Sequence, residues 1–152
     1  MPNWVYTTLF IEGKDSELKK FADFIRNDNY YHAEDDPKKR VHLFDFGKLI
    51  PRPAEEEKNW YNWNCDNWGT KWNACDVYID NHEKGILRYQ FETAWSRLSD
   101  ELWAKMKELF PSLKFDLSAD EEAGFFYSDT EYGNIVDFEG CRYEDEEEED
   151  DE

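Results

Sequence analysis

The sequence predicts a single domain of the α+β class, from two observations. Stretches in which apolar and polar side chains alternate recur along the chain, as in strands with one buried face. Between them lie two stretches with helical spacing of apolar side chains, as in helices packed on a sheet. The 152 residues are 39% hydrophobic and 18% aromatic, which is enough apolar material for one core.

The first strand is expected at residues 3–11, a run rich in β-branched and aromatic side chains that Gly13 ends. A helix follows, with either Asp15 or Ser16 as its N-cap. Its apolar side chains fall on one face: Leu18, Phe21, Phe24 and Ile25.

Residues 28–74 then interrupt the pattern and are expected to form an insertion. Its first part, residues 28–41, is polar and charged, which predicts an exposed segment. Residues 43–50 are apolar enough to pack on the domain, and residues 54–63 predict a short helix. So long a connection needs packing of its own, and its aromatic side chains can supply this packing.

An antiparallel hairpin is expected next, because alternation on both sides of a turn at residues 81–85 gives it one buried face. The inward side chains are Cys75, Val77, Ile79, Leu87, Tyr89 and Phe91.

A second helix begins after Ser99, a favourable N-cap, and Pro111 stops it. Its expected apolar stripe is Leu102, Met106, Leu109 and Phe110. Residues 113–117 alternate as another strand, and residues 124–128 and 134–138 flank a turn in a terminal hairpin.

In chain order these elements predict a ferredoxin-like βαββαβ sandwich with a long insertion after the first helix and an added C-terminal β-hairpin. The domain is expected to span residues 1–143 with the insertion at about residues 28–74. Residues 144–152 are expected to form a disordered acidic tail, because they contain nothing to bury.

The net charge is −19, and it has two parts. The tail contributes nine consecutive acidic residues, while residues 1–143 carry 28 acidic and 18 basic side chains, a net charge of −10. Such a surface repels phosphate backbones, so direct nucleic-acid binding is not expected, whereas a basic partner is. The alternative is that the acidity only keeps the protein soluble. The candidate partner-binding residues of the tail are Glu144, Asp145, Glu146, Glu147, Glu148, Glu149, Asp150, Asp151 and Glu152.

The sequence predicts no catalytic residue, metal ligand or cofactor, because no hydrolase, phosphate-loop or zinc-protease motif occurs in it. The three cysteines, Cys65, Cys75 and Cys141, lack the close spacing of a zinc site and are expected to be reduced thiols. No apolar run is long enough for a membrane span, and no signal peptide precedes the first strand. A cytoplasmic location without membrane contact is expected.

The segment from residue 67 to residue 74 has two interpretations. Trp68 and Trp72 could stack on nucleic-acid bases with Lys71 beside them. Alternatively, these tryptophans fix the insertion onto the sheet, with their N–H groups donating to internal acceptors. The acidic neighbours Asp66 and Asp76 favour the second interpretation.

Four segments occur together, in the same order, in one known family: residues 1–5, 46–53, 67–74 and 91–96. The chain resembles, over about residues 1–128, the phage and conjugative-plasmid proteins with a YubB-type ferredoxin-like domain (Api-phage-like proteins of mostly unknown function). The resemblance implies the same fold and brings no catalytic residues with it. It implies a structural role for Asn67, Trp68, Gly69, Thr70, Lys71, Trp72, Asn73 and Trp95. The chain departs from the family in having Arg97-Leu98 where prolines are common, and the acidic tail lies outside the resemblance.

The resemblance implies a protein of a mobile genetic element, acting in the host cytoplasm. The expected function is therefore a non-enzymatic accessory protein that binds the basic surface of a nucleic-acid-binding host defence protein, as an anti-CRISPR or anti-restriction protein or a DNA mimic does. One alternative is a structural or regulatory module that binds proteins through its aromatic insertion. Another is a small nucleotide-binding enzyme.

Overall fold

A computed structural model of the protein describes residues 3–32, 36–80 and 83–143. The acidic tail at residues 144–152 lies outside the described residues. The elements of the described part are β1 (Trp4–Glu12), α1 (Asp15–Ile25), β2 (Asn27–His32), β3 (Asp36–His42), the 3₁₀ helices η1 (Phe46–Lys48) and η2 (Ala54–Asn59), α2 (Trp60–Asn67), β4 (Cys75–Asp80), β5 (Ile86–Ala94), α3 (Asp100–Leu109), β6 (Lys114–Glu121), β7 (Phe126–Glu131) and β8 (Asn134–Glu139). None of the helices in these ranges is long and apolar enough to cross a membrane.

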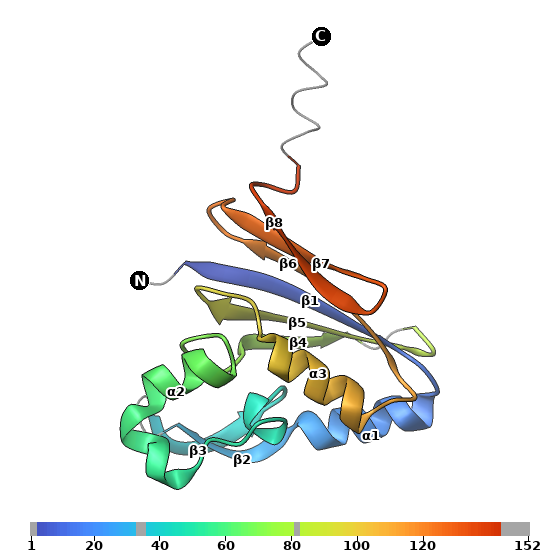
Figure 1. Ribbon diagram of the computed structural model, residues 1–152. Coiled ribbons are helices and arrows are strands. Elements are labelled where there is room, and N and C mark those ends of the chain that lie inside the picture. The colour runs from blue at the N-terminus through green and yellow to red at the C-terminus, as the bar shows by residue number, and fades with distance from the viewer. Residues whose placement is uncertain (1–2, 33–35, 81–82, 144–152) are drawn as a thin grey trace.

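Six strands form one sheet in the order β4-β5-β1-β6-β7-β8, and every pairing within it is antiparallel. The first strand of the chain, β1, lies in the interior of this sheet between β5 and β6. A second, two-stranded sheet contains β2 and β3. Helices α1 and α3 lie on one side of the large sheet, and α2 and the β2–β3 sheet lie on that side too (Figure 1). The mixed α and β class with an antiparallel sheet is thus confirmed.

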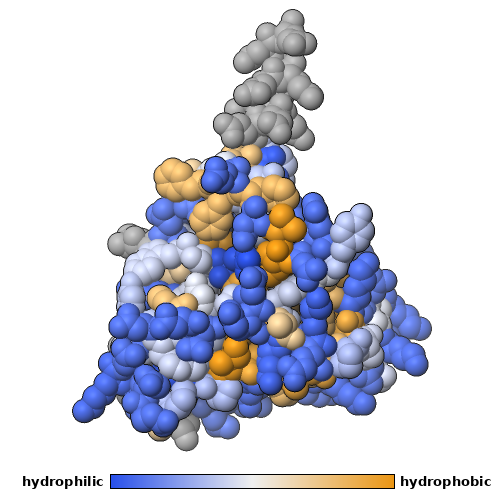
Figure 2. Space-filling view, viewed as in Figure 1, coloured by the Kyte–Doolittle hydropathy of each residue, from blue (hydrophilic) through white to orange (hydrophobic). Residues whose placement is uncertain are grey.

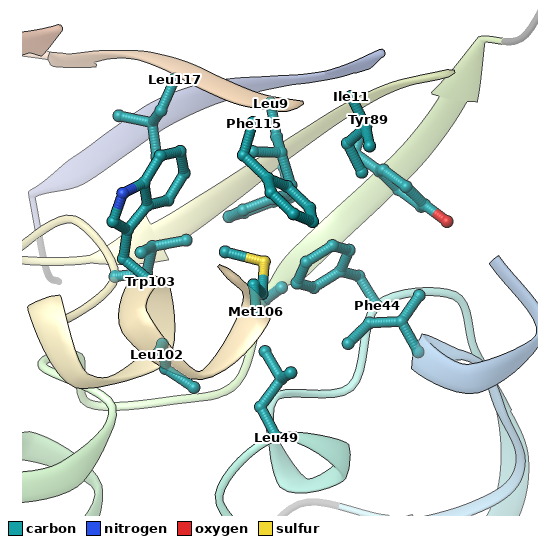
Figure 3. Close-up of a cluster of buried hydrophobic side chains, with 14 of the residues drawn as sticks. Leu9, Ile11, Phe44, Leu49, Tyr89, Leu102, Trp103, Met106, Phe115 and Leu117 are labelled. Carbon is teal, nitrogen blue, oxygen red and sulfur yellow. The ribbon is translucent and has the colours of Figure 1, made fainter. Parts of the chain in front are cut away.

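The core lies between the large sheet and the elements on its helical side. Leu9, Ile11 and Tyr89 point from the strands toward Met106 of α3 and toward Phe44, just before η1 (Figure 3). All five side chains are fully buried. The predicted packing of residues 43–50 on the domain is confirmed, because Phe44, Phe46 and Leu49 are all core residues.

The opposite side of the sheet, called the open face below, is partly apolar. In β1, buried side chains alternate with Tyr6 and Phe10, which are 47% and 40% exposed. On β4, Tyr78 is 58% exposed. No helix among the described residues covers this face (Figure 1).

Three details differ from the sequence predictions. Helix α1 is capped by Lys14, without a side-chain bond, because the Asp15 carboxylate instead accepts from the Gly85 backbone N–H at 2.9 Å. Strands β2 and β3 pair with each other in a region where the sequence predicts an exposed segment and no strand. In α3, Leu109 is 41% exposed and Trp103 takes its place in the core. The Ser99 N-cap is confirmed, since its Oγ accepts from the Leu102 N–H.

The C-terminal hairpin extends the sheet and is fastened to α3. The Trp103 Nε1–H and the Lys107 ammonium both donate to the Gly133 carbonyl, at 2.9 and 2.7 Å. Arg97, just before α3, forms an ion pair with Asp137 of β8 at 2.7 Å. This arginine, together with a hydrogen bond from Ser128, holds the pKa of the Asp137 carboxyl below its ordinary value, although partial burial acts in the opposite direction.

Candidate functional site

A large pocket lies where the insertion meets the β4 edge of the sheet. Its volume is about 760 Å³. Aromatic side chains from distant parts of the sequence form most of its wall, and we call it the aromatic pocket. It is lined by Trp4, Tyr30, Arg40, Val41, His42, Leu43, Trp60, Tyr61, Lys71, Trp72, Asn73, Ala74, Cys75, Asp76 and Val77.

The chain reaches this pocket through a sharp turn after α2. Gly69 has a φ of +78°, and a Cβ there would lie 3.1 Å from the Ser99 backbone nitrogen. A side chain at this position would therefore be strained and crowded at once. Ser99, the N-cap of α3, also bonds to the end of α2. Its Oγ donates to the Asn67 carbonyl at 2.8 Å, and its N–H donates to the Trp68 carbonyl at 2.9 Å.

Two buried motif residues anchor the 67–74 segment next to the pocket. Trp68 is 5% exposed, and its indole N–H donates to the Ile50 carbonyl at 2.9 Å. Asn73 is 4% exposed; its amide donates to Asp45 at 2.7 Å, and its carbonyl oxygen accepts from the Phe46 and Ala74 N–H groups at 2.9 Å. These bonds join the aromatic motif to η1 and position the residues between them.

Lys71 and Trp72, by contrast, face the pocket. The Lys71 ammonium lies 4.5 Å from the Trp72 ring centroid, 5.3 Å from that of Trp95 and 5.5 Å from that of Tyr61. We call this arrangement the Lys71 cage. The Trp72 ring also packs on Trp4 of β1, with 6.0 Å between centroids. The cage thus holds a positive charge beside the pocket by cation–π attraction.

Backbone strain concentrates near the same place. Three described residues other than glycine have a positive φ, and two of them are Asp76 (φ 49°) and Trp95 (φ 74°). Asp76 lines the pocket at an irregularity in the β4–β5 register, and Trp95 belongs to the Lys71 cage. Such conformations cost about 1–3 kcal/mol each and cluster at functional sites. The position of this strain favours a functional role for the pocket.

The polar groups of the pocket do not form a nucleophile with its base. His42 and Cys75 both line it, but His42 Nε2 donates to the Ala74 carbonyl at 2.9 Å and Nδ1 accepts from the Phe44 N–H at 3.1 Å. Both ring nitrogens are therefore committed to the backbone, and neither is free to take a proton from the thiol. Within the described ranges, no group of three or more His, Cys, Asp or Glu side chains could hold a metal ion.

A second feature adjoins the pocket on the open face. Asp76, Glu92 and Glu122 lie close enough to influence one another, and we call them the carboxylate cluster. Partial removal from water is the largest cause that raises the pKa of Glu92, followed by the charge of Asp76, a hydrogen bond to Asp76 and the charge of Glu122. The pKa of Tyr6 is raised too, by loss of water and then by Glu122 and Glu92. No ion pair joins the cluster to a basic residue in the described part of the chain.

The cluster predicts an unusual titration for Glu92. Its pKa should lie above the ordinary value of 4.5, and Glu122→Gln should move it down, because one of the neighbouring negative charges is lost. Carbon-detected NMR of the side-chain carboxyl measures both values. Since the folded-state pKa is the higher one, the resulting stabilisation is present below pH 4.5 and is lost as the pH rises through the folded-state pKa. A matched Glu101→Gln substitution, on α3, should leave the Glu92 titration unchanged; equal effects of the two would contradict this prediction.

At the other end of the open face, on β6 and β7, acidic side chains are paired with a basic residue. Arg142 pairs with Asp120 at 2.9 Å and with Asp129 at 2.6 Å, and its guanidinium lies 4.7 Å from the Tyr127 ring centroid. The Tyr127 ring in turn stacks on Phe138. Asp120 and Asp129 thus have a basic partner, in contrast to the carboxylate cluster.

The candidate residues from the sequence fall into two groups. The acidic tail lies outside the described residues, so the structure does not place it. Of the motif residues, Lys71, Trp72 and Asn73 line the pocket. Asn67, Trp68, Gly69 and Thr70 lie outside its lining, and Trp95 contacts Lys71 from just after β5. Sequence reasoning missed Trp4 and Tyr61 as pocket residues, and Glu92 and Glu122 as cluster residues. Trp4 and Glu92 had a usable signal, since both lie at outward positions of recognisable strands.

Comparisons with known proteins support the architecture. No family model matches the sequence, and no curated protein matches it. Among solved structures, the crystal structure of protein api92 from Yersinia pseudotuberculosis, described with the family model DUF1281, is similar with a TM-score of 0.68. The two chains share a fold. The similarity covers 91% of this chain and 98% of api92 at 9% sequence identity, so it extends to the fold and not to function.

Proposed function

We propose that this protein is a non-enzymatic binding protein whose acidic open face docks on the basic, nucleic-acid-binding surface of another protein. The observation that carries the proposal is the carboxylate cluster, in which Asp76 and Glu122 lie close to Glu92 on the open face. Partial removal from water, and after it the charges of these two neighbours, raise the pKa of Glu92. A lysine or arginine from a partner would relieve this repulsion, because it would supply the opposite charge that no described residue provides.

The surroundings of the cluster support the same function. Tyr6 and Tyr78 are 47% and 58% exposed on the open face, and aromatic side chains are enriched where proteins bind one another. Hydrophilic residues cover most of the surface in Figure 2, with hydrophobic residues gathered in smaller patches. The net charge of −19 would attract a basic partner over a longer distance and speed its association.

The proposal includes a finer description of the molecule. In it, β1, α1, β4, β5, α3 and β6 form a ferredoxin-like kernel, with β2 to α2 as the insertion and β7–β8 as the added hairpin. The protein belongs to a phage or conjugative plasmid of the YubB-type family and acts in the host cytoplasm. Its partner is a nuclease or surveillance complex of the host, which it inhibits as an anti-CRISPR or anti-restriction protein by occupying the nucleic-acid site. The acidic residues 144–152 add to the negative charge that attracts the partner.

Pulldown from a bacterial host lysate tests the proposal. The full-length protein and a chain ending at Tyr143 are compared at low and moderate salt, with a triple variant that carries Asp76→Asn, Glu92→Gln and Glu122→Gln. The triple variant should recover at least tenfold less partner than the wild type, and recovery should fall as salt screens the attraction. A matched triple, Asp23→Asn, Glu101→Gln and Glu108→Gln, removes the same charge from α1 and α3 and should change recovery less than threefold.

Two results would contradict the proposal. If neither chain recovers a nucleic-acid-binding protein at either salt concentration, a basic partner is excluded. If the two triple variants lose partner equally, net charge acts alone and the open face has no specific role.

A further inference from the structure

The aromatic pocket has the size and composition of a small-molecule site. The docking function proposed above assigns no role to this cavity. Its volume of about 760 Å³ falls within the range of roughly 300–1,000 Å³ typical of small-molecule sites. The ring systems of Trp4, Tyr30, Tyr61 and Trp72 form much of its lining, which suits a planar aromatic ligand.

The charged residues of the lining determine whether the ligand should be an anion or a cation. Arg40 and Lys71 are basic, and Asp76 is the acidic residue of the lining. Asp76 belongs to the carboxylate cluster, where its charge helps to raise the pKa of Glu92. The Lys71 ammonium rests over three aromatic rings and forms no ion pair with any residue of the described ranges. An anionic group beside Lys71 would provide that missing pair while the aromatic part of the ligand lies against Trp72.

The overall charge limits how large the ligand can be. At physiological salt, charges more than about 8 Å apart are largely screened, so one anionic group in the pocket responds mainly to the charged residues of the lining, Arg40, Lys71 and Asp76. An oligonucleotide would instead bring successive phosphates over a body with a net charge of −10. The pocket therefore fits a small monomeric anion and not a strand of nucleic acid.

We propose that the aromatic pocket binds a nucleoside monophosphate or a close chemical equivalent, with the base against the Trp72 side of the pocket and the phosphate beside Lys71. Binding occurs without turnover, because both nitrogens of His42 are committed to the backbone. The pocket adjoins the docking face proposed above and shares Asp76 with it, whereas Lys71 and Trp72 lie outside the carboxylate cluster.

Calorimetric titration of the full chain with AMP, adenosine and inorganic phosphate tests this proposal. AMP should bind saturably, adenosine about tenfold more weakly, and inorganic phosphate alone without detectable heat. Lys71→Gln keeps the length of the side chain but removes its charge, so it should weaken AMP binding about tenfold and leave adenosine binding within twofold. Lys48→Gln, at an exposed lysine outside the pocket, is the matched control and should change neither affinity by more than twofold.

A second variant tests the aromatic contact. Trp72→Leu should weaken the binding of AMP and of adenosine alike by about tenfold or more, since stacking does not depend on the phosphate. Circular dichroism checks that this variant folds, and Trp72→Phe replaces it if it does not.

The proposal is overturned if AMP binding does not saturate at millimolar concentration, if phosphate alone binds as well as AMP, or if Lys71→Gln weakens adenosine binding as much as AMP binding. Neither variant alters the carboxylate cluster, so partner recovery by the same proteins shows separately whether the docking function holds.

Discussion

Replacing Phe44 with alanine should lower the free energy of unfolding by about 4 kcal/mol, the expected cost of removing a buried phenylalanine. Phe44 is fully buried, and its ring lies 4.9 Å from Tyr89 and 5.2 Å from Phe91, measured between centroids. It also contacts Phe21 of α1 and Phe46 of η1. One ring therefore connects the sheet, the first helix and the insertion, and nothing nearby is free to fill its volume.

Urea denaturation followed by fluorescence measures this loss. Phe125→Ala serves as the control, because Phe125 is 69% exposed and its removal should cost less than about 0.5 kcal/mol. Phe44→Leu should fall between them, since it retains part of the volume. If Phe44→Ala and Phe125→Ala shifted the midpoint equally, the insertion would not be packed on the sheet through this residue.

The second large effect is expected for Asn73→Ala, with a loss of about 3 kcal/mol. The substitution removes the donor to the buried Asp45 carboxylate and the acceptor for the Phe46 and Ala74 N–H groups. Buried polar groups left without partners carry their full desolvation cost, and here two backbone N–H groups lose their acceptor. The Asp45 carboxylate loses one of its bonds and keeps those from the Asn27 side chain and the Gly47 N–H. The loss should therefore exceed that of an ordinary hydrogen bond.

Asn62→Ala is the matched control for this substitution. Asn62 is exposed on α2 and donates only to the neighbouring Asn59 side chain at 3.2 Å, so its loss should cost less than about 0.5 kcal/mol. The same urea experiment compares the two variants. A near-wild-type midpoint for Asn73→Ala would mean that water enters the site and replaces the lost bonds.

The sequence predicted those parts of the fold that have a local periodic signal. Residues of β1 and β5 alternate over their whole length, and α3 begins at a serine with the geometry of a true cap. Strands β2 and β3 lack this alternation, so the sequence predicts only that residues 28–41 are polar and exposed. Leu109 matched the helical spacing but not the core, because Trp103 with its bond to Gly133 occupies the contact with the sheet.

The candidate site was predictable only in part, for a different reason. The motif around Trp72 was visible in the sequence, but the pocket arises only when Trp4 and Tyr61 meet it in space. Likewise, alternation places Glu92 on the outward side of its strand, but acidic residues are so numerous that the sequence does not show which of them meet there. Cross-strand pairing and the register irregularity of β4 bring its neighbours together, and neither can be deduced from one sequence.

The interior position of β1 has a consequence for how the chain folds during its synthesis. β1 is made first, yet Leu9 pairs with Tyr89 on one side and with Leu117 on the other, both much later in the chain. Until these partners emerge, an apolar strand with two unpaired edges has nothing to pair with, and such strands are prone to aggregate. The same long-range pairing makes the native topology slow to form.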